Sequence, residues 1–165
     1  MRNLKKSLKE FLKNASKIGL LGIGSELRSD DAAGMLVAEL VQVYSGGAKP
    51  GMPLKVFMGA TAPENLTGEI KKFAPSHLIF VDTASFGGKP GDIMVLKPEN
   101  VNNYSFSTHK LPIKVMIDYL LQSIRTEVLI IGIQPKSIEF GEPPSSEIKE
   151  AVKGVAKIIE EVLNA

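Results

Sequence analysis

An aspartate pair, a further aspartate and a histidine stand at positions where they could bind a metal ion or take part in hydrolysis. Asp30 and Asp31 follow one short apolar segment, Asp82 follows another, and His109 precedes a segment with helical spacing. If the apolar segments are parallel strands, these residues gather at the carboxyl edge of the sheet, where ligands usually bind. Carboxylates accept most divalent ions, and imidazole favours nickel, copper, zinc or iron. The sequence therefore predicts an incomplete metal shell with positions open for water or a substrate group.

Each of these residues also has a structural interpretation. Asp30 or Asp31 could cap the following helix, whose first amides lack partners and whose dipole favours a negative charge. Asp82 could accept hydrogen bonds from turn amides, as aspartate often does after a strand. The second histidine, His77, stands at the start of its strand, away from the predicted site, and is expected to be structural. A lone histidine before a helix is also more often structural than a metal ligand, and His109 becomes a candidate ligand only because the two acidic positions are expected to lie near it.

The elements that must position these residues alternate between strand and helix. Continuous apolar segments predict strands at 18–23, 54–58, 77–81, 92–96 and 127–133. Apolar residues at helical spacing, with start signals such as Pro112 and a cap at Ser145 or Ser146, predict helices after Asp31, at about 63–73, after Pro112 and at 145–163. The helix after Pro112 is expected to bury Val115, Met116, Tyr119 and Leu120.

This alternation predicts a three-layer α/β/α fold, a single domain over residues 1–165 with a mostly parallel sheet of about five strands. The strand at 92–96 follows its predecessor too closely for a helical crossover, so it is expected to be antiparallel.

Residues 1–17 predict a basic amphipathic helix that extends the domain. One face carries apolar residues and the other carries lysines: Leu4, Leu8, Phe11, Leu12 and Ala15 against Lys5, Lys6, Lys9 and Lys13. Such a helix could lie on an anionic membrane or act as an organelle presequence. The alternative, a helix docked on the domain by its apolar face, is favoured because amphipathic helices usually face a core.

Composition narrows the remaining possibilities. The 165 residues are 44% hydrophobic and 23% charged with a net charge of +2, which is typical of a globular domain without a strongly charged partner. The absence of cysteine excludes disulfides, thiolate metal sites and cysteine nucleophiles. No apolar run approaches the roughly 20 residues of a membrane span, and the N-terminus lacks a signal-peptide core. We therefore expect a cytoplasmic monomer without stable membrane insertion.

Competing motifs are incomplete. Residues 22–24 begin like a dinucleotide-binding loop, but Leu27 stands where G-x-G-x-x-G needs its third glycine. Ser25, His109 and Asp82 lack the G-x-S-x-G elbow of a serine hydrolase. The lysine-rich N-terminus has one aromatic residue, so nucleic acid is not an expected partner.

Five stretches in a fixed order resemble the hydrogenase maturation endopeptidases, which process the large subunit of nickel–iron hydrogenases. They are GIGSELRSDDAAG (22–34), APEN (62–65), LIFVDTASFGGKPGDI (78–93), STHKLP (107–112) and IGIQP (131–135). The stretches THKLP and GIQP are most similar to the branch that serves formate-hydrogenlyase-type hydrogenases. Ser25 replaces a more usual asparagine, and Ala32-Ala33 replaces a pair that usually contains glycine.

The resemblance implies a site and a reaction. The family binds metal through an acid of its D-[DE] pair, the aspartate of V-D-[AT] and the histidine of T-H, which here are Asp31, Asp82 and His109. It implies removal of a C-terminal extension from the large-subunit precursor after nickel insertion, with the precursor's own nickel recognised at this site. Asp31 and Asp82 are the catalytic candidates, since one could also act as a general base through water. Two alternatives stay open: a non-cleaving nickel-dependent checkpoint or metal-delivery module, and a nucleotide- or small-molecule-binding domain that uses the loop at 22–25.

Overall fold

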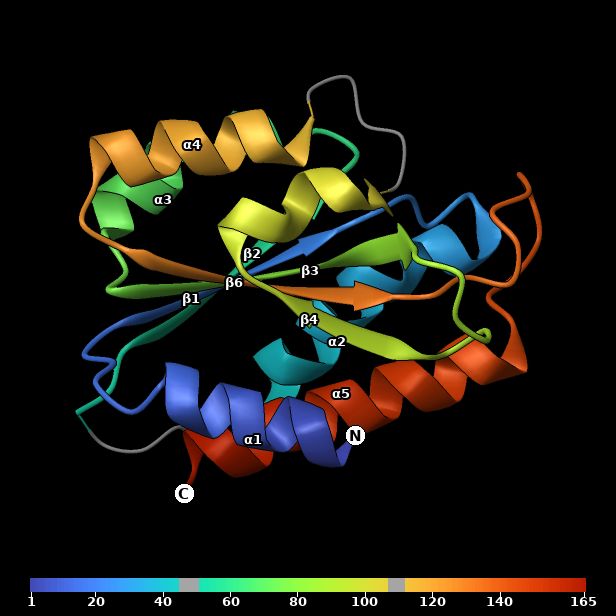
Figure 1. Ribbon diagram of the computed structural model, residues 1–165, viewed down its shortest axis with the longest axis horizontal. Coiled ribbons are helices and arrows are strands. Elements are labelled where there is room, and N and C mark those ends of the chain that lie inside the picture. Colours follow the sequence, from blue (N-terminus) through green and yellow to red (C-terminus); the bar gives the residue numbers. More distant parts are fainter. Residues whose placement is uncertain (45–50, 107–111) are drawn as a thin grey trace.

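The computed structural model describes residues 1–44, 51–106 and 112–165, and its sheet lies between two layers of helices (Figure 1). The main strands lie in the order β2 (Leu54–Ala60), β1 (Ile18–Ile23), β3 (His77–Ser85), β6 (Glu127–Ile133) and β4 (Ile93–Leu96). The first four are mutually parallel, and β4 pairs antiparallel with β6, as the short connection before it predicts. The predicted α/β fold with a mostly parallel sheet is confirmed.

A sixth strand, β5 (Ser105–Phe106), pairs antiparallel with the end of β3 and was not predicted. The strand β3 also continues to Ser85, so Asp82 lies inside a strand and the expectation of a turn at this position is wrong. Both differences lie at the carboxyl edge of the sheet. There, β5 adds a short ladder to β3 at Ala84 and Ser85.

The helices cover both faces of the sheet. On one face lie α1 (Arg2–Phe11), α2 (Ala33–Tyr44) and α5 (Ser146–Leu163), and on the other lie α3 (Thr67–Phe73) and α4 (Ile113–Ser123). Figure 1 shows α3 and α4 above the sheet and α1 and α5 below it. Alternate residues of β3 serve the two cores: Ile79 and Val81 face the first layer, whereas Leu78 and Phe80 face the second. Burial on both faces explains the continuous apolar strand sequences.

The helix α1 is shorter than the predicted 1–17 and is docked on the domain. Its apolar residues Leu4 and Leu8 are buried in the first core, and Lys5 Nζ lies 2.6 Å from a carboxylate oxygen of Glu161 on α5. The apolar face is therefore covered by the protein itself, as the docked alternative expects.

The buried face of α4 differs from the prediction. Met116 and Leu120 are buried as predicted, but Val115 and Tyr119 are exposed, and Ile113 and Ile117 complete the face toward the core. Tyr119 instead receives a hydrogen bond from Lys71 Nζ on α3, and this ammonium also lies 4.8 Å from the centre of the tyrosine ring. The buried residues have i, i+3, i+4, i+7 spacing, which is the regular pattern of a helix face toward a core.

The start of α2 lies against the ends of β1 and β3 because Gly34 permits a close approach. A Cβ on Gly34 would lie 2.2 Å from the carbonyl oxygens of both Ile23 and Val81. No side chain fits at this distance. The chain between β1 and α2 is therefore held close to both strand ends, and it carries Asp30 and Asp31 in the short 3-10 helix η1 (Ser29–Ala32).

Candidate active site at the carboxyl edge of the sheet

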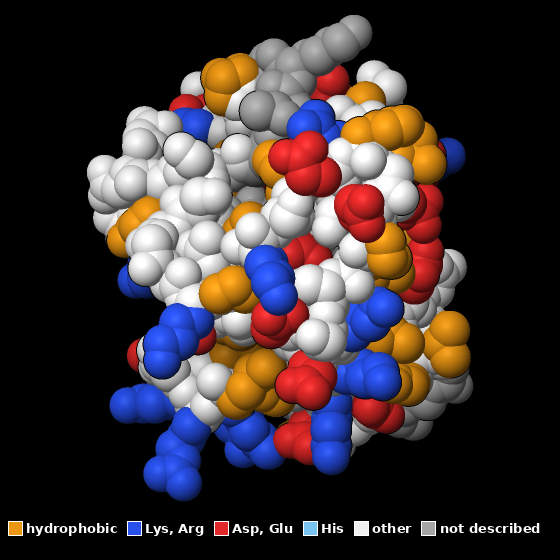
Figure 2. All heavy atoms as spheres, turned by 90° about the vertical axis from the view of Figure 1, so that its right-hand side faces the viewer, with side chains coloured by type: hydrophobic (Ala, Val, Ile, Leu, Met, Phe, Trp, Pro, Cys, Tyr) orange, Lys and Arg blue, Asp and Glu red, His pale blue; other side chains and the backbone are white. Residues whose placement is uncertain are grey.

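The candidate site lies where the strand order changes direction. From β1 the chain passes to β2 on one side of it, and then crosses to β3 on the other side. In open α/β sheets, ligands bind in the crevice outside the carboxyl ends of two such strands. Figure 2 looks onto this edge, where acidic, basic and hydrophobic side chains are intermingled. Asp31 lies in η1 and Asp82 in β3, and the two segments are in contact at this edge.

Asp31 is buried and joins η1 to β3. Its Oδ2 accepts a hydrogen bond from the amide of Ser25 at 2.9 Å, and its Oδ1 accepts one from Thr83 Oγ1 at 2.9 Å. A carboxylate has about four acceptor sites, so these two bonds with described residues do not saturate it. The two bonds fix the orientation of the carboxylate, which is what a metal ligand or a general base requires.

Asp82 is fully buried one residue before Thr83. Its Oδ1 accepts a hydrogen bond from the amide of Thr83 at 2.8 Å. Because side chains alternate along a strand, Asp82 projects toward the α3 and α4 layer, whereas Thr83 projects toward the layer of α2 and meets Asp31. Asp31 therefore lies on one face of β3, and the side chain of Asp82 lies on the other.

The third predicted ligand, His109, falls in residues 107–111, outside the described residues. Within the described part of the chain, no group of three His, Cys, Asp or Glu side chains lies close enough to hold a metal ion. Asp31 and Asp82 are therefore the two predicted ligands whose placement can be stated.

Asp30 has a different role from its neighbour. Its fully buried carboxylate accepts hydrogen bonds from the amides of Lys136 (2.7 Å), Ser137 (3.1 Å) and Ser145 (2.6 Å). Its own amide donates to the carbonyl of Ser137 at 3.1 Å. Asp30 thus holds the long loop between β6 and α5 against η1. Because the side-chain bonds of Asp30 and Asp31 run to other segments, the interpretation of either aspartate as the cap of α2 is wrong.

The loop between β6 and α5 is a part of this edge that sequence reasoning missed. Its first residue, Gln134, uses Oε1 to accept hydrogen bonds from the amides of Phe86 (2.9 Å) and Gly88 (3.2 Å), which orders the segment after β3. At its end, Ser145 accepts a hydrogen bond from the amide of Ile148 and caps α5, as predicted. The stretch IGIQP pointed to this loop, but nothing in its sequence pointed to Asp30 as its partner.

Two backbone amides of the glycine-containing loop at 22–25 are hydrogen-bonded within the protein. The amide of Gly24 donates to the carbonyl of Ala60, and the amide of Ser25 donates to Asp31. A Cβ on Gly24 would lie 1.8 Å from the carbonyl oxygen of Asp31, so this loop is packed directly on η1. A phosphate-binding loop needs amides that point at the ligand, and these two amides are used elsewhere.

The other histidine, His77, lies at the amino end of β3, and its predicted structural role is confirmed. Its ring packs edge-on against Phe11 with 4.9 Å between ring centres, and Nδ1 lies 3.0 Å from Ser76 Oγ. Burial lowers the pKa of His77 from its ordinary value, while the carboxylate of Glu127, 3.7 Å from Nε2, acts in the opposite direction. These neighbours account for the polar atoms of the ring.

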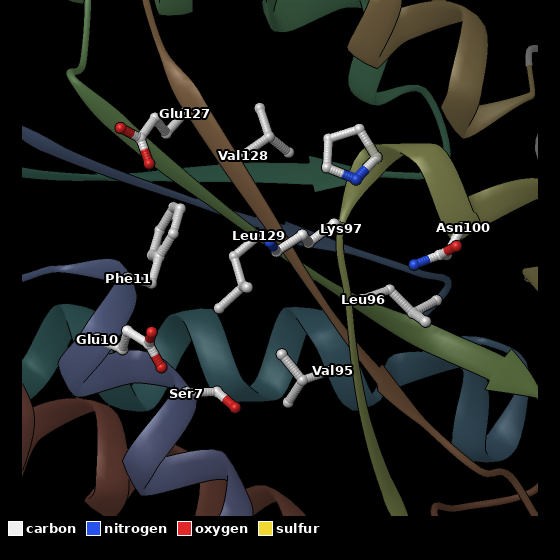
Figure 3. Close-up of a pocket in the computed structure, with 11 residues that line it drawn as sticks. Ser7, Glu10, Phe11, Val95, Leu96, Lys97, Asn100, Glu127, Val128 and Leu129 are labelled. Atoms are coloured by element: carbon white, nitrogen blue, oxygen red, sulfur yellow. The ribbon is translucent and has the colours of Figure 1, made fainter.

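A cavity of about 600 Å³ lies at this amino end rather than at the site (Figure 3). It is bounded by α1 and by the neighbouring ends of β4 and β6, with Phe11, Val95 and Leu129 among its walls. The start of β6 is paired with the start of β3, and its Val128 lies opposite Leu78, four residues before Asp82. The cavity therefore does not belong to the arrangement of aspartates.

Among the described residues, no helix is long and apolar enough to cross a membrane.

Comparisons with known proteins agree on one family. A profile described as a hydrogenase maturation protease matches residues 36–162, a range that includes Asp82 and His109 and begins after Asp31. A Methanocaldococcus jannaschii protein, named as a candidate hydrogenase maturation protease, is 36% identical over 166 residues, which is 96% of this chain and 98% of its own. The hydrogenase 3 maturation protease of Escherichia coli is 34% identical over 142 residues, covering 86% and 87% of the two chains.

A solved structure agrees with these sequences. The crystal structure of a nickel–iron hydrogenase maturation protease from Thermococcus kodakarensis has a TM-score of 0.82 and 32% sequence identity. The match covers 96% of this chain and 99% of that one.

Proposed function

This chain belongs to the hydrogenase maturation protease family, and we propose that it removes the C-terminal extension of a nickel–iron hydrogenase large-subunit precursor after nickel has been inserted. The family is one of endopeptidases and implies the large-subunit precursor as substrate and a nickel-dependent reaction. The proposed finer step is that the nickel of the precursor docks on Asp31, Asp82 and His109. Residues 1–165 are proposed to act as one domain, with α1 packed on α5.

The observation that carries the proposal is the pair of buried aspartates at the crevice between β1 and β3. Asp31 and Asp82 are both almost wholly removed from water, and Thr83 connects them, since it follows Asp82 in the chain and donates to Asp31. A buried carboxylate is stabilised by a nearby positive charge, and carboxylates bind divalent ions. A nickel ion carried by the substrate supplies that charge.

The two aspartates act first as ligands in this proposal. The bonds from Ser25 and Thr83 hold the carboxylate of Asp31 in one orientation, so that it need not reorganise when the precursor docks. One of the two carboxylates would also accept a proton from the water that attacks the scissile carbonyl. That assignment requires the carboxylate to lie within hydrogen-bond reach of the water when the precursor is bound.

The other two functions are less well supported. A nucleotide-binding role for the loop at 22–25 is disfavoured because the amides of Gly24 and Ser25 are bonded within the protein. A checkpoint module that binds without cleaving would use the same three residues, and membership in an endopeptidase family argues against it.

A cleavage assay tests the proposal. The purified protein is mixed with nickel-loaded and nickel-free precursor of its own hydrogenase, and the precursor mass is followed. We expect loss of C-terminal mass with nickel only, and no loss with Asp82→Asn or His109→Ala. His77→Gln is the matched control, because it changes a buried polar residue at the other end of β3. An intact precursor that binds only with nickel would assign the checkpoint role, and cleavage by both variants would refute the proposed site.

A further inference from the structure

Two large apolar side chains are exposed on the loops that border the candidate site. Leu27 is 65% exposed in the loop after β1, and Phe140 is 74% exposed in the loop after β6. The two loops are in direct contact, because the amide of Gly141 donates to the carbonyl of Leu27 at 2.8 Å. Leu27 and Phe140 therefore stand on neighbouring backbone segments, and the two exposed side chains are called here the Leu27–Phe140 patch.

The backbone beneath this patch is firmly held. Besides the three amide bonds of Asp30, Ser29 Oγ donates to the carbonyl of Pro143 at 3.1 Å, and Arg28 Nε donates to that of Ile138 at 3.3 Å. These bonds fix the loops without using either apolar side chain. A single exposed leucine needs no explanation, but an exposed phenylalanine beside it on a second fixed loop is typical of an interaction site.

The patch is continuous with the candidate active site. Leu27 donates its amide to Ser25 Oγ at 3.3 Å, and the amide of Ser25 in turn holds Asp31. A polypeptide bound with its scissile bond at Asp31 would therefore run close to the loop that carries Leu27. Three exposed glutamates, Glu26, Glu139 and Glu142, lie within two residues of the patch along the chain. Only one exposed cation, Arg28, lies within the same distance along the chain, so the net negative charge disfavours an anionic membrane surface as the partner.

We propose that the Leu27–Phe140 patch is a docking surface for an apolar segment of the precursor protein, next to the bond that is cleaved. The inference rests on the proposed function and adds the recognition of the polypeptide to that of the nickel. The aspartates would bind the nickel, whereas the patch would bind the polypeptide that carries it. Contacts made equally in the bound substrate and in the transition state raise affinity without changing the chemical step. The patch should therefore govern KM and leave kcat nearly unchanged.

The double variant Leu27→Ser/Phe140→Ser tests this inference. Both side chains are exposed, so the fold should be retained. We expect KM for the nickel-loaded precursor to rise about 10- to 100-fold, with little change in kcat. This factor corresponds to losing the binding free energy of one or two apolar side chains that become buried in the complex. The matched control is Val43→Ser, which removes an apolar side chain that is 76% exposed on the last turn of α2, at the other end of that helix from the site.

Direct binding separates this inference from the proposed function. The dissociation constant of nickel-loaded precursor is measured with and without the patch substitutions, in a background of Asp82→Asn if the wild type cleaves. A tenfold or greater weakening supports docking even if the wild type fails to cleave, in which case only the proposed function is refuted. Cleavage by the wild type with an unchanged KM and dissociation constant in the double variant would overturn the docking surface alone. Patch-dependent sedimentation with phosphatidylcholine–phosphatidylglycerol vesicles, without an effect on precursor binding, would assign the patch to membranes and also overturn the proposal.

Discussion

The two ends of the parallel sheet both bury ionisable groups, yet they use them in different ways. At the amino end, His77 is surrounded by Phe11, Ser76 and Glu127, which satisfy it locally beside a cavity of about 600 Å³ with both polar and apolar walls. At the carboxyl end, Asp30 and Asp31 bind segments that are far apart in the sequence. The large cavity and the buried carboxylates that join separate loops thus lie at opposite ends of the sheet, and the proposed chemistry belongs to the end with the carboxylates.

The difference between the two ends follows from the topology. Parallel strands deliver their following loops to one edge, so residues after β1, β3 and β6 converge there. The amino end receives the returning chain and is covered by α1, an element outside the alternation of strands and helices. Substitutions at the carboxyl end should therefore reduce activity or weaken the contacts that hold the loops together, whereas those at the amino end should change only stability.

The largest expected effect comes from Asp31→Asn. The amide side chain keeps the shape but removes the charge that a cation requires, so cleavage of nickel-loaded precursor should fall by at least about 100-fold, more than is usual for residues that merely support a ligand. The melting temperature should stay the same or rise, because removing a buried charge relieves its desolvation. Precursor mass and thermal unfolding measure the two quantities. Near-normal cleavage would remove the functional distinction between the two ends.

The next effect is on stability and comes from Asp30→Ala. The substitution leaves the amides of Lys136, Ser137 and Ser145 without their buried charged acceptor, which should lower the free energy of unfolding by about 3 to 5 kcal/mol. Urea unfolding measures this loss. Asp30→Asn, which retains an acceptor oxygen, should lose less. Equal stability of Asp30→Ala and the wild type would mean that the loop between β6 and α5 is held by other contacts.

Much of the fold could be predicted because burial leaves a mark on the sequence. The strands β1, β3 and β6 are apolar on both faces and read as continuous runs. The face of α4 could be predicted only in part: Met116 and Leu120 are buried as expected, but apolar residues also occur on the other sides of this helix, and the predicted face contains Val115 and Tyr119 instead of Ile113 and Ile117. The strand β5 has two residues, which is too short for any periodicity.

The position of the candidate site in the fold could be predicted, but the different roles of Asp30 and Asp31 could not. The carboxyl edge follows from strand order, and both aspartates lie at it. Yet Asp30 and Asp31 are identical residues in sequence, and only their partners distinguish them. The partners of Asp30 are backbone amides more than 100 residues away. Every residue except proline supplies such an amide, so no sequence signal marks those that Asp30 binds.

A smaller effect is expected at the amino end from Leu8→Ala. Leu8 is fully buried where α1 packs on the domain, and its truncation should cost about 2 to 3 kcal/mol of stability. This lies at the lower end of the range for Leu→Ala because a terminal helix can detach without unfolding the sheet. Urea unfolding checks the loss, with the exposed Lys6→Ala as control. Cleavage per folded molecule should be unchanged, and a specific loss of activity would connect α1 to the site.

The smallest effect concerns the pH dependence of stability and His77. Burial lowers the pKa of His77 in the folded protein below the value of 6.5 for the free side chain. As the pH falls below 6.5, the unfolded chain takes up a proton at this residue before the folded protein does, so stability declines. The contribution of His77 is complete above pH 6.5 and is lost toward lower pH, with a slope of at most about 1.4 kcal/mol per pH unit.

The difference between the wild type and His77→Gln isolates this contribution. Urea midpoints of both proteins are measured from pH 5 to 8, and the decline below 6.5 should be shallower in the variant. His109 is present in both proteins, so its titration cancels. Glu147, whose pKa is lowered to about 2 mainly by its hydrogen bond from Lys136, titrates below the window. Parallel profiles would mean that the carboxylate of Glu127 offsets the effect of burial on the pKa of His77. The amino end would then stabilise a charged histidine with a carboxylate, much as a bound cation would stabilise the carboxylates at the other end.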